Sequence, residues 1–99
     1  MTNKDLENII ADGALIIDVR TPEEYKVGHI NGSLNIPLRD IVDAMTWLLK
    51  DVSIITVCAS GMRSEQAKAM LEVNGFVKVY NGGSWSSLGK MNVGVCKIK

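Results

Sequence analysis

The sequence predicts an α/β fold built around a mainly parallel β-sheet. Short apolar runs alternate along the chain with segments whose apolar residues recur at helical spacing. The apolar runs are continuous, which is typical of parallel strands buried on both faces. Capping, Pro and Gly signals fall at the boundaries between the two kinds of segment. These observations favour strands and helices that alternate through one domain.

The amino-terminal part of the chain predicts a helix and then a strand. Leu6, Ile9 and Ile10 recur at helical spacing, and Gly13 is a stop signal. Residues 15–19 form a continuous apolar run that is broken by one Asp near its carboxyl end. We expect this run to be a strand in the centre of the sheet.

A second helix start follows this strand. In the segment 21–24, Thr is the cap, Pro occupies the first helical position and the last Glu closes a capping box. Gly28 ends the helix after a short run, and residues 34–37 predict a brief strand.

The second half of the chain continues the alternation. It predicts a helix with one apolar face over 41–49, a buried strand over 53–57, a helix from about Ser64 to 74–75, and a strand over 77–80. Gly82-Gly83 is expected to turn the chain into a short helix around Trp85, and residues 90–99 carry no assignment.

Composition and charge limit the function. The 99 residues correspond to one domain over 1–99. Hydrophobic residues make up 46% of the chain and charged residues 22%, which is enough for a hydrophobic core that needs no disulfides. Lys and Arg number 11, as do Asp and Glu, which argues against nucleic acid or an anionic membrane as an obligate partner. No apolar run approaches the roughly 20 residues that span a bilayer. Residues 1–5 lack the features of a signal peptide, so we expect a cytoplasmic protein.

The most informative segment covers residues 54–64. A β-branched run ends in Cys58, and a loop with Gly61 and Arg63 leads to a helix start at Ser64. This pattern places a thiol at the carboxyl end of a buried strand, beneath the N–H groups of a tight loop and the positive end of a helix. Such surroundings lower the pKa of a thiol and stabilise an anion on sulfur. The segment therefore predicts a cysteine nucleophile.

Four segments resemble the signatures of the rhodanese family. Residues 18–25 (DVRTPEEY) and 28–38 (GHINGSLNIPL) look like its two amino-terminal signatures, and 58–64 (CASGMRS) looks like its active-site loop. Residues 75–85, with paired glycines and a Trp, resemble its carboxyl-terminal signature. One departure follows that Trp, where residues 86–88 read Ser-Ser-Leu and many members have a second aromatic residue.

The resemblance implies a thiosulfate sulfurtransferase with a central parallel five-stranded sheet and helices on both faces. It implies that Cys58 carries a persulfide and moves sulfane sulfur from thiosulfate or another persulfide to a thiophilic acceptor such as cyanide or a thiol. The expected partners are a small-molecule donor and acceptor, with a protein acceptor as an alternative. Cys58 and Cys96 form no metal-spacing pair, and we expect no metal and no cofactor.

Sulfur transfer requires groups that stabilise negative charge on the reacting sulfur. Gly61 is expected to supply a backbone angle that a side chain would forbid. For the hydroxyl of Ser60 there are two alternatives: it points at the sulfur, or it only stabilises the turn. The expected binding groups are the backbone N–H groups of Ala59, Ser60, Gly61, Met62 and Ser64.

Two side chains of the loop are candidates for contact with the donor. Arg63 is expected to bind an anionic donor such as thiosulfate, because a guanidinium matches an oxyanion. The alternative is an ion pair between Arg63 and a nearby carboxylate. Met62 is expected at the rim of the site.

The remaining candidates are assigned scaffold roles. Asp18 is expected to accept N–H bonds from a neighbouring loop, and Arg20 to pair with Glu24. His29 is expected to be structural, since a low-pKa thiolate needs no separate base. Trp85 is expected in the core rather than at the donor entry.

Three alternatives stay open beside a sulfurtransferase. One is a sulfur-relay module that delivers persulfide to a protein partner, and another is a non-catalytic binding domain, against which the intact Cys58 argues. A cysteine-based phosphatase is less favoured, because four rather than five residues separate Cys58 from Arg63. Cys96 is an unrelated thiol or, as a less favoured hypothesis, a resolving thiol.

Overall fold

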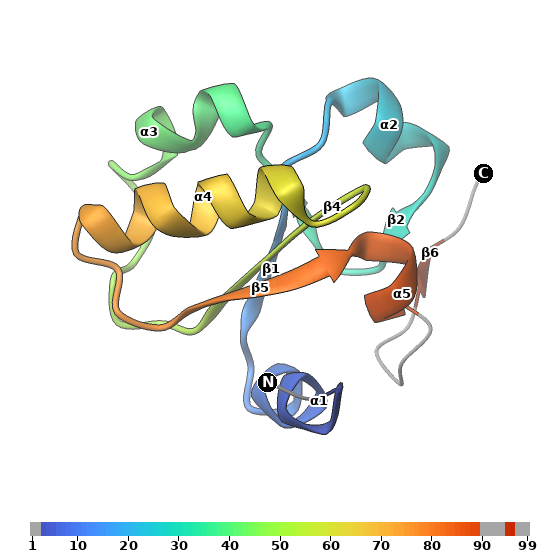
Figure 1. Ribbon diagram of the computed structural model, residues 1–99, viewed down its shortest axis with the longest axis horizontal. Helices are drawn as coiled ribbons and strands as arrows, with labels where there is room; N and C mark the ends of the chain where they lie inside the picture. Colours follow the sequence, from blue (N-terminus) through green and yellow to red (C-terminus); the bar gives the residue numbers. More distant parts are fainter. Residues whose placement is uncertain (1–2, 90–94, 97–99) are drawn as a thin grey trace.

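The computed structural model describes residues 3–89 and 95–96 and shows a parallel sheet between two layers of helices (Figure 1). Four parallel strands lie in the order β3-β1-β4-β5. They are β1 (Leu15–Asp18), β3 (Leu34–Asn35), β4 (Ile54–Cys58) and β5 (Val79–Ser84). The helices are α1 (Asn3–Ala11), α2 (Pro22–Val27), the 3₁₀ helix η1 (Leu38–Asp40), α3 (Ile41–Ala44), α4 (Met62–Val73) and α5 (Trp85–Gly89).

The number of parallel strands differs from the five that the resemblance implied. The described residues form four, and a separate antiparallel pair joins β2 (His29–Ile30) to β6 (Val95–Cys96). Each strand of that pair has two residues, which is too short for an apolar run to reveal it. The predicted strands of the central sheet are otherwise all present.

Strand β4 is buried along its whole length and separates two hydrophobic clusters. Ile54 and Cys58 belong to the cluster beneath α3 and α4. Ile55 and Val57 belong to the cluster on the opposite face, which includes residues of α1 and α5. This alternation follows from the two-residue period of a strand, and it confirms the expectation of helices on both faces.

Several predicted elements have different bounds from those expected, and two of the differences affect the packing of the sheet. The helix over 41–49 ends as α3 at Ala44, and turns carry the chain on to the buried Leu48. Gly82 and Gly83 lie inside β5 rather than in a turn after it. A Cβ on Gly82 would stand 2.8 Å from Cγ2 of Ile55, so this glycine allows close packing between the two strands.

A buried ion pair closes the carboxyl end of β1. Nε and Nη2 of the Arg20 guanidinium both donate to the carboxylate of Asp18, and the distance from Nη2 to the carboxylate is 2.8 Å. Neither side chain is more than 5% exposed. The expected pairing of Arg20 with Glu24 is therefore wrong. Arg20 reaches only the main-chain oxygen of Glu24 and also donates to that of Gly28 at 2.7 Å, so it ties β1 to the middle of α2 and to the residue that caps its carboxyl end.

In the described part of the chain, no helix combines the length and apolar character needed to cross a membrane.

Substitution Asp18→Asn is expected to destabilise the fold by about 3–5 kcal/mol, because it leaves the buried guanidinium of Arg20 without a counter-charge. The matched control is Asp40→Asn. Asp40 is half-exposed, lies 4.0 Å from Arg39 and makes no side-chain cap, so its loss should cost less than about 1 kcal/mol. Urea unfolding measures both variants, and equal shifts would contradict a special role for the buried pair.

Candidate active site

Cys58 lies where the sequence pattern predicts, as the last residue of β4, with a side chain that is fully buried. A three-residue loop, 59–61, connects it to α4, which begins at Met62 rather than near Ser64. Met62 is therefore the first helical residue and not part of the loop. Its side chain is 77% exposed, which confirms the expected position at the rim.

The backbone of Gly61 directs an N–H group at the sulfur. Gly61 has φ +105°, in the left-handed region that favours glycine, as the sequence predicts. Its N–H donates to Sγ of Cys58 across 2.9 Å. A substitution here would strain the backbone and move this donor.

Burial raises the pKa of the Cys58 thiol, but hydrogen bonds outweigh it and hold the pKa below its usual value. The contributing groups are the Ser64 hydroxyl and the backbone of Ser64, Gly61 and Ser60. Oγ of Ser64 lies 3.5 Å from Sγ, and the thiol donates to this oxygen. To stabilise the thiolate after ionisation, the single proton of the Ser64 hydroxyl must turn from Asn81 Oδ1 toward the sulfur. Of the expected backbone groups, the Gly61 N–H donates to the sulfur, and those of Ser60 and Ser64 also contribute to the lower pKa of Cys58.

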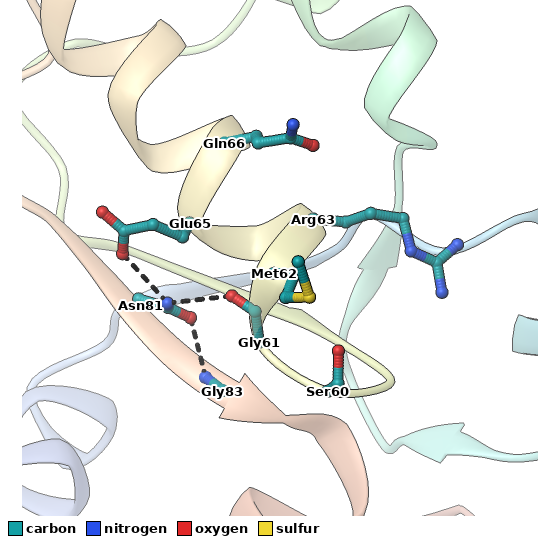
Figure 2. Close-up of a pocket in the computed structure, with 8 residues that line it drawn as sticks. All are labelled: Ser60, Gly61, Met62, Arg63, Glu65, Gln66, Asn81 and Gly83. Carbon is teal, nitrogen blue, oxygen red and sulfur yellow. Dashed lines mark hydrogen bonds between the residues drawn. The ribbon is translucent and has the colours of Figure 1, made fainter.

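Asn81 is a part of the site that sequence reasoning missed. Its Oδ1 accepts from Ser64 Oγ at 2.6 Å and from the Gly83 N–H at 2.8 Å. Its Nδ2 donates to the Gly61 carbonyl at 3.2 Å and to the Glu65 carboxylate at 3.0 Å (Figure 2). One amide on β5 thus holds both the hydroxyl beside the sulfur and the carbonyl of the glycine that faces it. No local pattern marks Asn81, because three of its four partners, in Gly61, Ser64 and Glu65, lie outside β5.

A cleft of about 890 Å³ opens beside the loop. Four of the predicted site residues line it, together with residues of α4 and β5 (Figure 2). The lining residues are Ser60, Gly61, Met62, Arg63, Glu65, Gln66, Asn81 and Gly83. Ser64 lies beneath this surface and is fully buried. The exposed Ala59 is adjacent in the loop but is not among the lining residues.

Arg63 extends away from Glu65 and Asn81 (Figure 2) and forms an ion pair with α2. Its Nη1 and Nη2 donate to the two carboxylate oxygens of Glu24 at 2.8 and 3.1 Å. The hydrogen bonds from Arg63 and Thr21 lower the pKa of Glu24 to about 2, and Glu24 raises the pKa of Arg63. This is the carboxylate pairing that the sequence left open for Arg63.

The contacts of the other candidate residues indicate structural rather than catalytic roles. The His29 ring stacks on Tyr25 with centroids 3.9 Å apart, and its Nδ1 lies 2.9 Å from the Tyr25 carbonyl oxygen. Trp85 packs against a core cluster, and the guanidinium of Arg20 lies 4.5 Å from its ring centroid. The backbone of Cys96 pairs with that of His29, while the side chain of Cys96 lies outside what the structure describes.

Comparison with known proteins places this geometry in a family. The model of the rhodanese-like domain matches residues 2–87. The thiosulfate sulfurtransferase PspE of Escherichia coli is 33% identical over 85 residues, which cover 84% of this chain and 77% of that protein. A crystal structure of a rhodanese-like domain protein from Staphylococcus aureus superposes with a TM-score of 0.79 at 32% identity, covering 100% of this chain and 96% of that one.

The similar proteins do not share one name. The tRNA uridine(34) hydroxylase of Buchnera aphidicola is 30% identical over 87 residues. These residues cover 81% of this chain but only 28% of the hydroxylase, so the chain spans just over a quarter of that protein's length.

Substitution Ser64→Ala is expected to raise the pKa of Cys58, because the thiolate loses the hydroxyl that stabilises it. Less thiolate is then present at a given pH. Alkylation of Cys58 by iodoacetamide at pH 6 should slow by roughly fivefold, as the loss of a hydrogen bond worth about 1 kcal/mol predicts.

The control for this variant is Ser33→Ala, which removes another buried hydroxyl, bound to the Ile30 carbonyl. It should leave the pH profile of alkylation unchanged. A Ser64→Ala profile that coincides with the wild-type profile would contradict the assigned role of the Ser64 hydroxyl.

Proposed function

This chain belongs to the rhodanese-like domain family, and from that premise we propose that it is a sulfurtransferase that carries sulfane sulfur as a persulfide on Cys58. The donor is thiosulfate or another persulfide, and the acceptor is a thiophilic molecule such as cyanide or a thiol. The observation that carries the proposal is the sulfur of Cys58 beneath the Gly61 N–H, with its pKa held below the usual value.

In the first step the Cys58 thiolate attacks the sulfane sulfur of the donor. An S–S bond forms to Cys58 while the S–S bond of the donor breaks, and sulfite or a thiolate leaves with the electron pair. The thiolate is the attacking species, so a lowered pKa increases its fraction at neutral pH. No separate base is needed, in agreement with the structural surroundings of His29.

In the second step the acceptor attacks the outer sulfur of the Cys58 persulfide. Cyanide forms a C–S bond while the persulfide bond breaks, which releases thiocyanate and restores the Cys58 thiolate. Negative charge therefore returns to the sulfur that Gly61 and Ser64 contact. Fixed N–H donors at that position favour the charged leaving group without taking up or releasing protons.

The phosphatase alternative gains no support from the site. Catalysis of phosphate transfer uses a guanidinium that clamps the transferring group. Arg63 instead donates to Glu24 with both Nη atoms. A sulfur-relay module that hands the Cys58 persulfide to a protein is compatible with the same chemistry, and the open cleft beside the loop is compatible with a macromolecular acceptor.

Incubation with thiosulfate is expected to add the mass of one sulfur atom to the protein, and cyanide should remove it as thiocyanate. The variant Cys58→Ser should show neither the mass gain nor turnover, because it lacks the nucleophile. Intact-mass spectrometry measures loading, and a colorimetric thiocyanate assay measures turnover.

The matched control is Cys96→Ser, which should load and turn over like the wild type. Loading that persists in Cys58→Ser and disappears in Cys96→Ser would contradict the assignment. Loading with slow turnover on cyanide would favour the relay module over an enzyme of small molecules.

A further inference from the structure

The cation beside the active-site loop is already occupied by a carboxylate of the same chain. Glu24 accepts from both Nη atoms of Arg63, at 2.8 and 3.1 Å, and the two residues are 39 positions apart in sequence. A bidentate pair of this kind occupies the Nη1–Nη2 edge of the guanidinium, which is one of the two edges at which an oxyanion can accept two hydrogen bonds. An anionic donor at this edge must displace Glu24, and a donor at the Nε edge meets a cation whose charge Glu24 already balances.

Glu24 is itself held in place by the start of α2. Its Oε1 accepts from the N–H of Thr21 at 2.9 Å and from the Thr21 hydroxyl at 3.2 Å, which completes the capping box. The carboxylate therefore has an anchor that is independent of Arg63. An incoming oxyanion that displaced it would leave two anions near one guanidinium.

The charges that line the cleft do not compensate for this. Arg20 is buried and bound to Asp18. Arg63 and Glu65 are the charged side chains among the residues that line the cleft. With Glu24 included, this group carries one positive and two negative charges, which disfavours the approach of a dianion such as thiosulfate.

We infer that Glu24 is a specificity-determining residue that holds Arg63 away from oxyanions, so that the site selects organic persulfides over thiosulfate as sulfur donors. The inference rests on the proposed sulfurtransferase function and names its donor class. An organic persulfide needs no cation for binding. The Cys58 thiolate attacks its outer sulfur, the S–S bond of the donor breaks, and the carrier leaves as a thiolate.

The variant Glu24→Gln separates the charge of Glu24 from its structural role. Gln also completes a capping box, so the cap at Thr21 is preserved while the negative charge on Arg63 is removed. The control is Glu23→Gln, which removes the same charge from an exposed neighbour on α2. The donors are thiosulfate and 2-hydroxyethyl persulfide, and loading of Cys58 is followed by intact mass.

Glu24→Gln is expected to raise kcat/KM for thiosulfate by roughly tenfold, mainly through a lower KM, because a charge-assisted contact to Arg63 becomes available. With 2-hydroxyethyl persulfide the change should stay below about twofold, since that donor makes no such contact. The gain with thiosulfate should disappear in Glu24→Gln combined with Arg63→Ala. Thermal unfolding of every variant checks that the fold is retained.

Equal changes with both donors, or an equal gain in Glu23→Gln, would overturn the inference, because the effect would then be one of general charge. A wild-type protein that loads from thiosulfate at least as efficiently as from 2-hydroxyethyl persulfide would also overturn it, whether or not Glu24→Gln folds. Failure of the wild type to load from either donor would instead refute the proposed function itself, and the inference with it.

Discussion

The chemistry proposed for this protein depends on one constraint: a sulfur atom must meet backbone N–H groups at the end of a strand that is buried on both faces. Strand β4 satisfies the burial, since all five of its residues are buried between two hydrophobic clusters. The loop after β4 supplies the N–H donor, because the left-handed backbone of Gly61 directs its N–H group at Sγ of Cys58. A fully buried thiol would otherwise have a raised pKa.

The loop keeps this geometry because residues of the neighbouring strands support it. Asn81 on β5 binds the Ser64 hydroxyl and the Gly61 carbonyl, and Thr56 on β4 donates to the Ser64 carbonyl at 2.9 Å. A register shift between β4 and β5 begins between Thr56 and Val57, opposite the segment that contains Asn81. Irregularities of this kind commonly redirect side chains near functional sites. Here a side chain on β5 reaches the loop that follows β4.

Two ion pairs near the loop have different roles. The pair between Asp18 and Arg20 is buried and joins β1 to α2, so its role is structural. The pair between Glu24 and Arg63 is about one-third exposed and lies at the rim of the site. An exposed pair adds little stability. Its more consequential effect is on which anions can bind to Arg63.

The sequence by itself determined the α/β class, the strand that ends in Cys58, the left-handed Gly61 and the capping box at Thr21. These features are encoded locally, by apolar periodicity and by residues with restricted backbone or capping preferences. Only the tertiary structure decided the partners of the polar side chains: Asn81 for Ser64, Glu24 for Arg63, and Asp18 rather than Glu24 for Arg20. Two of these contacts join residues 17 and 39 positions apart, and the third depends on how a buried side chain folds back at a strand end. Local patterns carry no information on such distances, because the packing of the sheet sets them.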